Sequence, residues 1–264
     1  MKAISFELSG RTACFRKPDV NQYTYFTYNN IHKPALLGLL GAILGLAGHI
    51  QLHNENRRIE EENKLIKKKA DKKPLNEGYP EFYQKLKDLK ISIIPLVPNG
   101  YFSKKIQVFN NSVGYASKEM GGNLIVREQW LESPIWKIMI LDDGSDEYKK
   151  LKEYLSDGKS VFIPYLGKND HPAKIDNVEE IVLSDNLVMN DGRYIDSLFI
   201  KNSDKIDGWQ REGEQPYLFQ EVSPVRFQKE YHFYEYETLV FTNMEIENIP
   251  HNTYSHKEKN YAFI

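Results

Sequence analysis

The chain has 264 residues, of which 41% are hydrophobic and 27% charged, so it can bury a substantial core, and wholesale disorder is excluded. Its 35 basic and 37 acidic side chains nearly cancel, which excludes a protein held to nucleic acid by net charge alone and leaves a local basic face for any such binding. The single cysteine, Cys14, excludes an internal disulfide. It is typical of a reducing cytoplasm and of a small buried thiol.

The first predicted element is a strand over residues 3–9, in which apolar and polar residues alternate. Gly10 interrupts the strand, and three basic residues, Arg11, Arg16 and Lys17, follow it. The next segment is a polar loop rich in aromatic residues. Its aromatic residues are Tyr23, Tyr25, Phe26 and Tyr28.

A helix is predicted over residues 34–48, because Pro34 suits a first helical turn and the residues after it are apolar nearly all round. Its apolar run is shorter than the roughly 20 residues that a membrane-spanning helix needs. We therefore expect a buried helix and no membrane association. Its glycines lower helix propensity, a cost that makes sense where another backbone packs closely.

Residues 55–73 are almost entirely charged, and pairs such as Glu60 with Lys64 predict an exposed helix. A second interpretation has the lysines at 67–69 contacting nucleic acid. Further along, strands are predicted at 91–97, 136–141 and 178–183, and a helix at 146–155 that Gly158 ends. The polar, glycine-rich segment 99–126 indicates a long hairpin, and insertions of this kind are often functional.

The predicted order is strand, helix, strand, long hairpin, strand, helix, strand. This is the order of an α+β, ferredoxin-like fold, the split βαβ arrangement. The remainder, residues 185–264, is predicted to be β-rich, with its clearest strand at 231–242.

Three segments together resemble the Cas-five family of the RAMP superfamily. They are ISFELSGRTACFRK at 4–17, PALLGLLGAILG at 34–45 and PYLGKNDHPA at 164–173. A fourth, REQWLESPIWKIMIL at 127–141, resembles the family's strand after the hairpin. The match follows the family's order over the first two-thirds of the chain, and its length and motifs are most similar to the type I-B members.

The resemblance implies a ferredoxin-like (RRM-like) RAMP domain at 1–184, with a charged helical extension at about 50–90 and a β-hairpin thumb at about 99–127, followed by a β-rich region at 185–264. It implies a structural, RNA-binding subunit of a type I CRISPR surveillance (Cascade) complex, which caps the foot of the complex and binds the 5′ handle of the crRNA in antiviral defence. The implied protein partners are the Cas-seven backbone subunit and the Cas-eight large subunit. Target DNA near the protospacer-adjacent motif is a further partner, and no cofactor is implied.

Basic side chains on phosphates and aromatic rings under bases hold single-stranded RNA. The segment 11–33 contains both kinds close together, and glycines near a helix start allow a phosphate to approach backbone N–H groups. For each tyrosine, the alternative is a ring that covers the core with its hydroxyl in water. The predicted RNA-binding residues are Arg11, Arg16, Lys17, Tyr23, Tyr25, Tyr28, Lys33, Pro34, Leu37, Gly38, Gly41, Lys104, Lys105, Lys118 and Arg127.

Two other functions stay open. A metal-independent ribonuclease of the same fold needs a general base and a cation for the phosphorane charge, and Lys168 with His171 is the candidate pair. The lack of a fuller constellation favours a protein without enzymatic activity. A protein scaffold without RNA contact is the third reading, suggested by the net charge of −2. The seven histidines show no HExxH or CxxC pattern, so no metal site is predicted.

Overall fold

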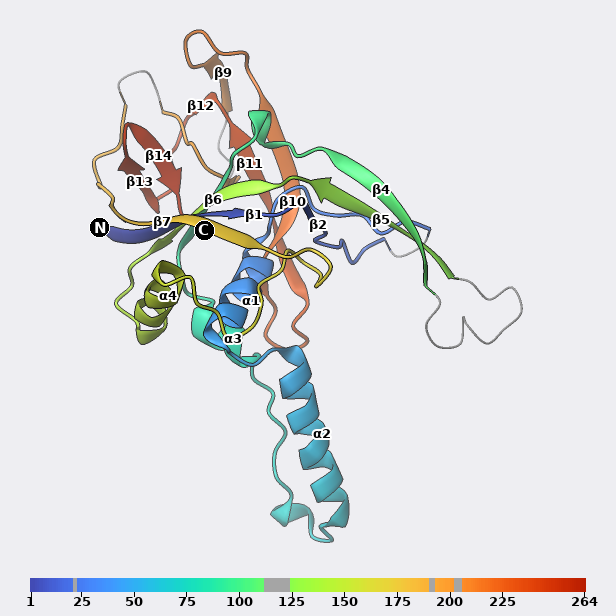
Figure 1. Cartoon of the computed structure of the whole chain (residues 1–264). Helices are drawn as coiled ribbons and strands as arrows, with labels where there is room; N and C mark the ends of the chain where they lie inside the picture. The colour runs from blue at the N-terminus through green and yellow to red at the C-terminus, as the bar shows by residue number, and fades with distance from the viewer. Residues whose placement is uncertain (21–22, 112–123, 190–192, 202–205) are drawn as a thin grey trace.

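The computed structural model describes residues 1–20, 23–111, 124–189, 193–201 and 206–264, and it combines helices with antiparallel sheets (Figure 1). At its centre is an antiparallel four-stranded sheet with the order β3-β6-β1-β7. Its strands are β1 (Lys2–Ser9), β3 (Ile91–Pro95), β6 (Ile135–Leu141) and β7 (Lys174–Val182). The α+β fold class and the four strands predicted for this part of the chain are confirmed.

The alternation of residues in β1 distributes its side chains over the two faces of this sheet. Ile4, Phe6 and Leu8 belong to the main buried cluster, on the face that the helices cover. Ala3 belongs to a second buried cluster, which Phe263 of the C-terminal region joins. The sheet therefore carries buried side chains on both faces.

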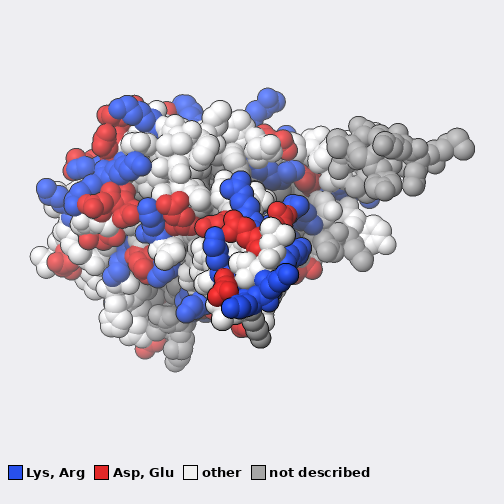
Figure 2. Space-filling view, turned by 90° about the horizontal axis from the view of Figure 1, so that it is seen from below, with Lys and Arg blue, Asp and Glu red and all other residues white. Residues whose placement is uncertain are grey.

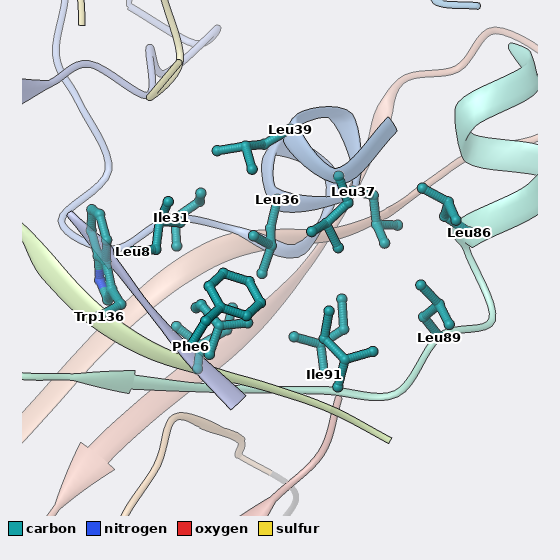
Figure 3. Packing of buried hydrophobic residues seen from close by; sticks show 14 of the residues in the cluster. Phe6, Leu8, Ile31, Leu36, Leu37, Leu39, Leu86, Leu89, Ile91 and Trp136 are labelled. Atoms are coloured by element: carbon teal, nitrogen blue, oxygen red, sulfur yellow. The ribbon is translucent and has the colours of Figure 1, made fainter. Parts of the chain in front are cut away.

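Helix α1 (Lys33–Leu44) follows β1 in the fold, and α4 (Asp146–Ser156) lies between β6 and β7. The short helix α3 (Glu81–Leu86) packs against α1. In Figure 3, Leu36 and Leu37 of α1 point toward the sheet, where Phe6 lies. Because α1 contacts the sheet side, α3, α4 and a C-terminal strand, it is apolar on nearly every side. It ends at Leu44, earlier than predicted, because Gly45 adopts a left-handed φ of 76°.

The close approach predicted for the helix glycines occurs at Gly41. A Cβ atom built on Gly41 would lie 2.6 Å from Cβ of Phe82 on α3, whereas one on Gly38 would meet nothing closer than 3.9 Å. We expect Gly41→Leu to lower the free energy of unfolding by roughly 1–3 kcal/mol through overpacking, as measured by urea denaturation. The control, Gly38→Ala, should leave stability unchanged or raise it by up to about 1 kcal/mol. Equal stability of the two variants would contradict the packing described here.

Between α1 and α3 the chain forms a protruding arm, defined here as α2 (His49–Leu65) with the returning segment 66–80 (Figure 1). The arm includes one 3₁₀ turn, η1 (Lys69–Asp71). No residue of α2 is buried, which confirms an exposed helix here, but its bounds differ from the predicted 55–73: it begins at His49 and ends at Leu65, because Ile66 is extended. No single helix among the described residues is long and apolar enough to span a membrane; α1 and α2 meet that test only together, with a bend of 76°.

A second sheet carries the predicted hairpin, here called the thumb. It consists of β4 (Lys104–Asn111) and β5 (Leu124–Glu132), and β5 also pairs with β2 (Thr12–Ala13). The 3₁₀ turn η2 (Pro98–Gly100) leads into it. Figure 1 shows the thumb and the arm leaving the central sheet in different directions. Lys118 lies outside the described residues.

The region 185–264 is β-rich, as predicted. In it, β10 pairs with β11, β11 with β8, β12 with β9, and β13 with β14. Val225 and Leu239 join the main core beside α1. The strands are β8 (Phe199–Ile200), β9 (Ile206–Gln210), β10 (Leu218–Phe227), β11 (Tyr234–Thr242), β12 (Met244–Ile246), β13 (Thr253–His256) and β14 (Lys259–Ala262).

Candidate nucleic-acid interface

The tyrosine-rich loop predicted after β1 extends the thumb sheet. The amide of Tyr25 donates to the carbonyl oxygen of Arg127 at 2.9 Å, and the amide of Gln129 donates to the carbonyl oxygen of Tyr25 at 2.8 Å. On its other side the loop folds back on itself, with Arg16 opposite Thr27. Through Thr12, Ala13 and Tyr25 the chain therefore extends the edge of the sheet at the base of the thumb.

Two exposed arginines lie on this edge. The guanidinium carbon of Arg16 is 3.5 Å from the ring centroid of Tyr25, a cation–π contact that orients the side chain. Arg11 is exposed next to the turn between β5 and β6, where its carbonyl oxygen accepts from the amide of Ser133 at 3.0 Å. Neither arginine is ion-paired with a carboxylate in the described ranges. Arg11, Arg16 and Tyr25 are called the arginine edge below.

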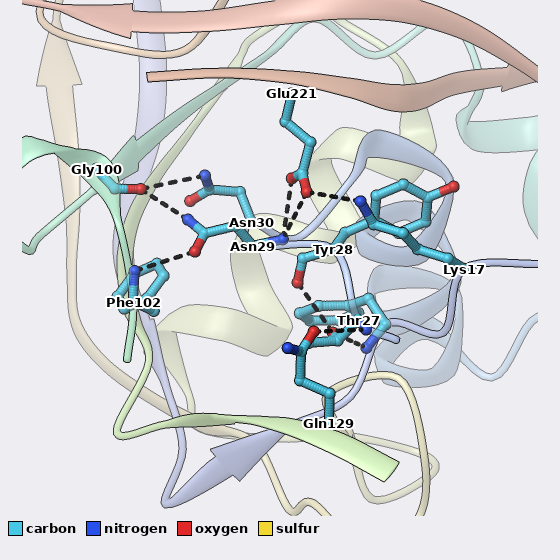
Figure 4. A network of polar contacts seen from close by, with 10 residues as sticks. Lys17, Thr27, Tyr28, Asn29, Asn30, Gly100, Phe102, Gln129 and Glu221 are labelled. Carbon is cyan, nitrogen blue, oxygen red and sulfur yellow. Dashed lines mark hydrogen bonds and ion pairs between the residues drawn. The ribbon is translucent and has the colours of Figure 1, made fainter. Parts of the chain in front are cut away.

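Lys17 and Lys104 lie nearby but are less free. Nζ of Lys17 is 3.2 Å from Oε1 of Glu221, which also accepts from the amide of Asn29 (Figure 4). Lys104 lies over the ring of Tyr101, and burial lowers its pKa. Beside Lys17 is a cavity of about 510 Å³, whose lining includes Glu221 and Tyr236. Part of the positive charge at this position is therefore already balanced by the protein.

Tyr28 does not offer its ring to a base, which corrects the sequence prediction. It is 2% exposed, and its ring meets that of His32 edge-on at 5.3 Å. Burial, followed by its hydrogen bond with Tyr236, raises its pKa. Tyr28 thus follows the alternative reading, that of a core tyrosine. Tyr23, in contrast, is 87% exposed with a φ of 63° and remains a candidate for stacking.

The start of α1 does not offer an anion site either, because His32 caps it. Nδ1 of His32 accepts from the amide of Ala35 at 3.2 Å, and the ring is enclosed by those of Phe15, Tyr28 and Tyr234. Burial lowers the pKa of His32 to about 3. The prediction of RNA contact here was wrong, since three of its residues are buried and the fourth faces Phe82. Those residues are Pro34, Leu37, Gly41 and Gly38.

Lys33 already has a partner in the fold. Its Nζ donates to the carbonyl oxygen of Ile264 at 3.1 Å, and burial lowers its pKa to about 8. It lines a cavity of about 280 Å³ with Tyr83 and Arg226, which does not share a residue with the arginine edge. RNA contact by Lys33 would therefore have to compete with this backbone partner.

On the thumb, Lys105 has partners within the protein, whereas Arg127 is exposed and not ion-paired with any described residue. Lys105 lies over the ring of Trp130 at 5.8 Å and approaches Glu132 at 3.9 Å. Arg127 is exposed opposite Val108, and no described residue forms an ion pair with it. The alternation of β5 places Arg127 on the face opposite Glu128, so the two faces of the thumb carry different charges.

The candidate nuclease pair is part of a packed turn. Both carboxylate oxygens of Glu128 accept from Nζ of Lys168 at 2.8 Å; burial lowers the pKa of Lys168, but this hydrogen bond and the Glu128 charge raise it overall. His171 is 1% exposed, its Nδ1 lies 2.7 Å from Oγ1 of Thr12, and burial lowers its pKa. These contacts fix the turn to β2 and β5, and they leave Lys168 ion-paired with Glu128 and the His171 ring buried.

Gly167 explains why this turn carries a glycine. Its φ is 87°, and a Cβ atom there would lie 2.0 Å from the carbonyl oxygen of Cys14. Cys14 itself is 1% exposed, and burial raises its pKa to about 11, as expected for a structural thiol. No group of three or more metal-ligating side chains exists within the described part of the chain.

Glu128 is the residue that sequence reasoning missed. It is 6% exposed, binds Lys168, and accepts from Nε1 of Trp130 at 2.9 Å. The signal available in the sequence was its place in a strand: with a two-residue period, Glu128 falls on the same face as Trp130 and the covered side of the thumb. A carboxylate on a covered face requires a cationic partner.

No protein-family model matches the chain, and no curated protein matches it. Solved structures of CRISPR-associated proteins are similar to it at low identity. One, described as a CRISPR RNA-guided surveillance complex, is 10% identical with a TM-score of 0.49, covering 93% of this chain and 91% of its own. A CRISPR protein from Archaeoglobus fulgidus is 8% identical with a TM-score of 0.44, covering 99% and 98%. A Cas protein is 12% identical with a TM-score of 0.39, covering 92% and 94%. Scores under 0.5 at such identities establish no shared family.

Proposed function

We propose that the chain is a non-catalytic, RNA-binding subunit of a type I CRISPR surveillance complex, one that binds the 5′ handle of the guide RNA and caps the foot of the complex. The observation that carries this proposal is the arginine edge, where Arg16 lies on Tyr25 at the base of a protruding thumb. Both groups are of the kind that grips single-stranded RNA, an unpaired cation for phosphate and an aromatic ring for a base.

The strand order supports the same proposal. The sheet order β3-β6-β1-β7, with α1 after the first strand and α4 before the last, is the order expected of the ferredoxin-like, split βαβ core that we propose. Two of the segments that resemble the Cas-five family, 4–17 and 164–173, lie together, since the amide of Cys14 donates to the carbonyl oxygen of Leu166 at 3.1 Å. The type I-B assignment and the Cas-seven and Cas-eight partners rest on the resemblance in sequence.

The alternative of a ribonuclease loses its candidate residues to structural contacts. Glu128 binds Lys168, and His171 lies inside the fold. A scaffold without RNA contact does not require exposed, unpaired arginines beside an aromatic ring. The test below distinguishes the proposed function from both alternatives, the ribonuclease and the scaffold.

The test incubates the full chain with labelled repeat RNA from the array of its own genome, in the presence of a chelator. We expect the handle sequence to bind more tightly than a shuffled one, to remain uncut, and to cross-link under ultraviolet light to the segment 11–28 or to the thumb. These residues carry the free cations and the exposed ring of Tyr23, and each stacked base contributes roughly 1–3 kcal/mol.

Other outcomes would overturn the proposal in distinct ways. A cut at one fixed position that His171→Ala abolishes would make the protein a processing enzyme. Absence of binding to either RNA would favour the scaffold. Cross-links confined to residues outside the segment 11–28 and the thumb would move the RNA site elsewhere in the fold.

A further inference from the structure

The arm has a defined structure although it buries little. Two asparagines of α2 hold the returning segment through reciprocal hydrogen bonds with its backbone. Asn56 bonds the backbone of Asn76 at 2.8 and 2.9 Å, and Asn63 bonds that of Lys73 at 2.8 Å in both directions. These bonds fix the returning segment alongside the helix.

Charge is segregated along the arm. Residues 49–63 contain four glutamates and two arginines, whereas residues 64–73 contain six lysines and a single aspartate. The ten residues at the tip thus carry a net charge of +5 in a chain whose net charge is −2. A fold-supporting role does not account for this separation.

Most of the lysines at the tip are free. Lys73 is paired with Glu62 at 2.7 Å. Lys64, Lys67, Lys68 and Lys72 are exposed, and no carboxylate of the described chain forms an ion pair with them. Seen end-on from below, a run of basic side chains borders the end of the arm (Figure 2).

We propose that the tip of the arm binds the phosphate backbone of a double-stranded nucleic acid, without reading its sequence. The segment 64–73 has no aromatic residue to stack on a base and no Arg, Asn, Gln, Ser or Thr; apart from its lysines and one aspartate, it has no side chain that reads a base edge. Lysine contributes a flexible point charge suited to phosphate. A double helix presents phosphates outward with its bases paired inside, which is the ligand these side chains match.

This site is separate from the arginine edge, so it extends the proposed function without depending on it. α2 has 17 residues, and at about 1.5 Å per residue it is about 26 Å long. The two sites also differ in chemistry, since the arginine edge includes an aromatic ring and the tip has none. A protein with both could hold a single strand at one site and a duplex at the other.

The test compares the full chain with Lys67→Ala/Lys68→Ala/Lys72→Ala by fluorescence anisotropy, across a salt series. The probes are a 20-base-pair DNA duplex, an RNA duplex of the same sequence, and the single strands. We expect the variant to bind duplex at least tenfold more weakly at low salt, with a salt dependence shallower by up to about 2.7 in log–log slope, or about 0.9 per lost contact. Binding of the handle RNA should not change.

The matched control is Lys149→Ala/Lys159→Ala/Lys174→Ala, which removes the same charge from exposed lysines outside the arm. An equal loss of duplex affinity in the control would show that the effect comes from net charge, which would contradict a binding site at the tip. So would unchanged duplex binding in the arm variant, or a preference of the tip for single strands. Comparing the affinities for the DNA duplex and the RNA duplex shows which kind of duplex supplies the phosphates. The variant Arg11→Ala/Arg16→Ala separates the two proposals. If it no longer binds the handle RNA but still binds duplex, the two sites act independently, and failure of one proposal leaves the other intact.

Discussion

Replacing Arg11 and Arg16 together by alanine is expected to weaken binding of the handle RNA by about 10- to 100-fold at low salt. Charge-assisted contacts of arginine with phosphate are strong and bidentate, which lysine does not reproduce. Losing two such contacts should also make the log–log salt dependence shallower by about 1.4, or about 0.7 per contact on a single strand. A salt series of binding isotherms measures both quantities.

Because both side chains are exposed and unpaired within the described residues, the double variant should unfold within about 0.5 kcal/mol of the wild type. The control, Arg57→Ala/Arg58→Ala in α2, removes the same charge and should bind the handle RNA with unchanged affinity. An unchanged slope and affinity in the Arg11 and Arg16 variant would remove the arginine edge from the RNA site. The thumb residues Lys105 and Arg127 would then be tested next.

Acidification is expected to destabilise the protein through His32. Its folded-state pKa is about 3 because burial disfavours the imidazolium, whereas the unfolded value is near 6.5. The unfolded chain therefore binds a proton that the folded protein rejects, so this stability is present above pH 6.5 and is lost as the pH falls toward 3. At about 1.4 kcal/mol per pH unit, the loss between pH 7 and pH 4 is roughly 3 kcal/mol.

The measurement is urea denaturation at several pH values on wild type and on His32→Asn. Asparagine keeps a capping oxygen for the amide of Ala35 but does not titrate. The variant will be less stable at every pH, since it loses ring contacts, so the informative quantity is the pH dependence. Burial also lowers the pKa values of His49 and His171, and the His32 share is the difference between the two curves. Parallel curves would show that His32 is charged or solvated in the folded protein.

Much of the fold could be predicted from the sequence because its signals are local. The alternation through Ile4, Phe6 and Leu8 predicts one buried face, and the structure places those residues under α1. The continuous apolar run of α1 predicts burial on several sides, which its contacts with α3, α4 and β10 confirm. The glycine-rich, basic segment before Arg127 predicts the thumb.

The candidate site was harder to predict because it depends on partners distant in sequence. In the sequence, nothing marks His32, and only its contacts with the rings of Phe15 and Tyr234, which are distant in sequence, make it a buried cap at the helix start. Tyr25 and Tyr28 are the same residue type in the same loop, and the sequence does not distinguish them. In the structure, Tyr25 lies at the arginine edge and Tyr28 lies in the core. Whether Lys168 is free depends on Glu128, 40 residues away.

The two ends of the arm meet at one place in the fold. The amide of Ala47 donates to Oε2 of Glu81 at 2.9 Å, and the amide of Phe82 donates to the carbonyl oxygen of Ala47 at 3.1 Å. The residues between Ala47 and Glu81 therefore leave and rejoin the rest of the fold at one place. Within them, His49 and Tyr79 also contact Phe227 there. Insertions and deletions are best tolerated at such positions. Evolution could lengthen the arm by whole helical turns, each adding about 5.4 Å, and so change its reach while the order of the central strands stays the same.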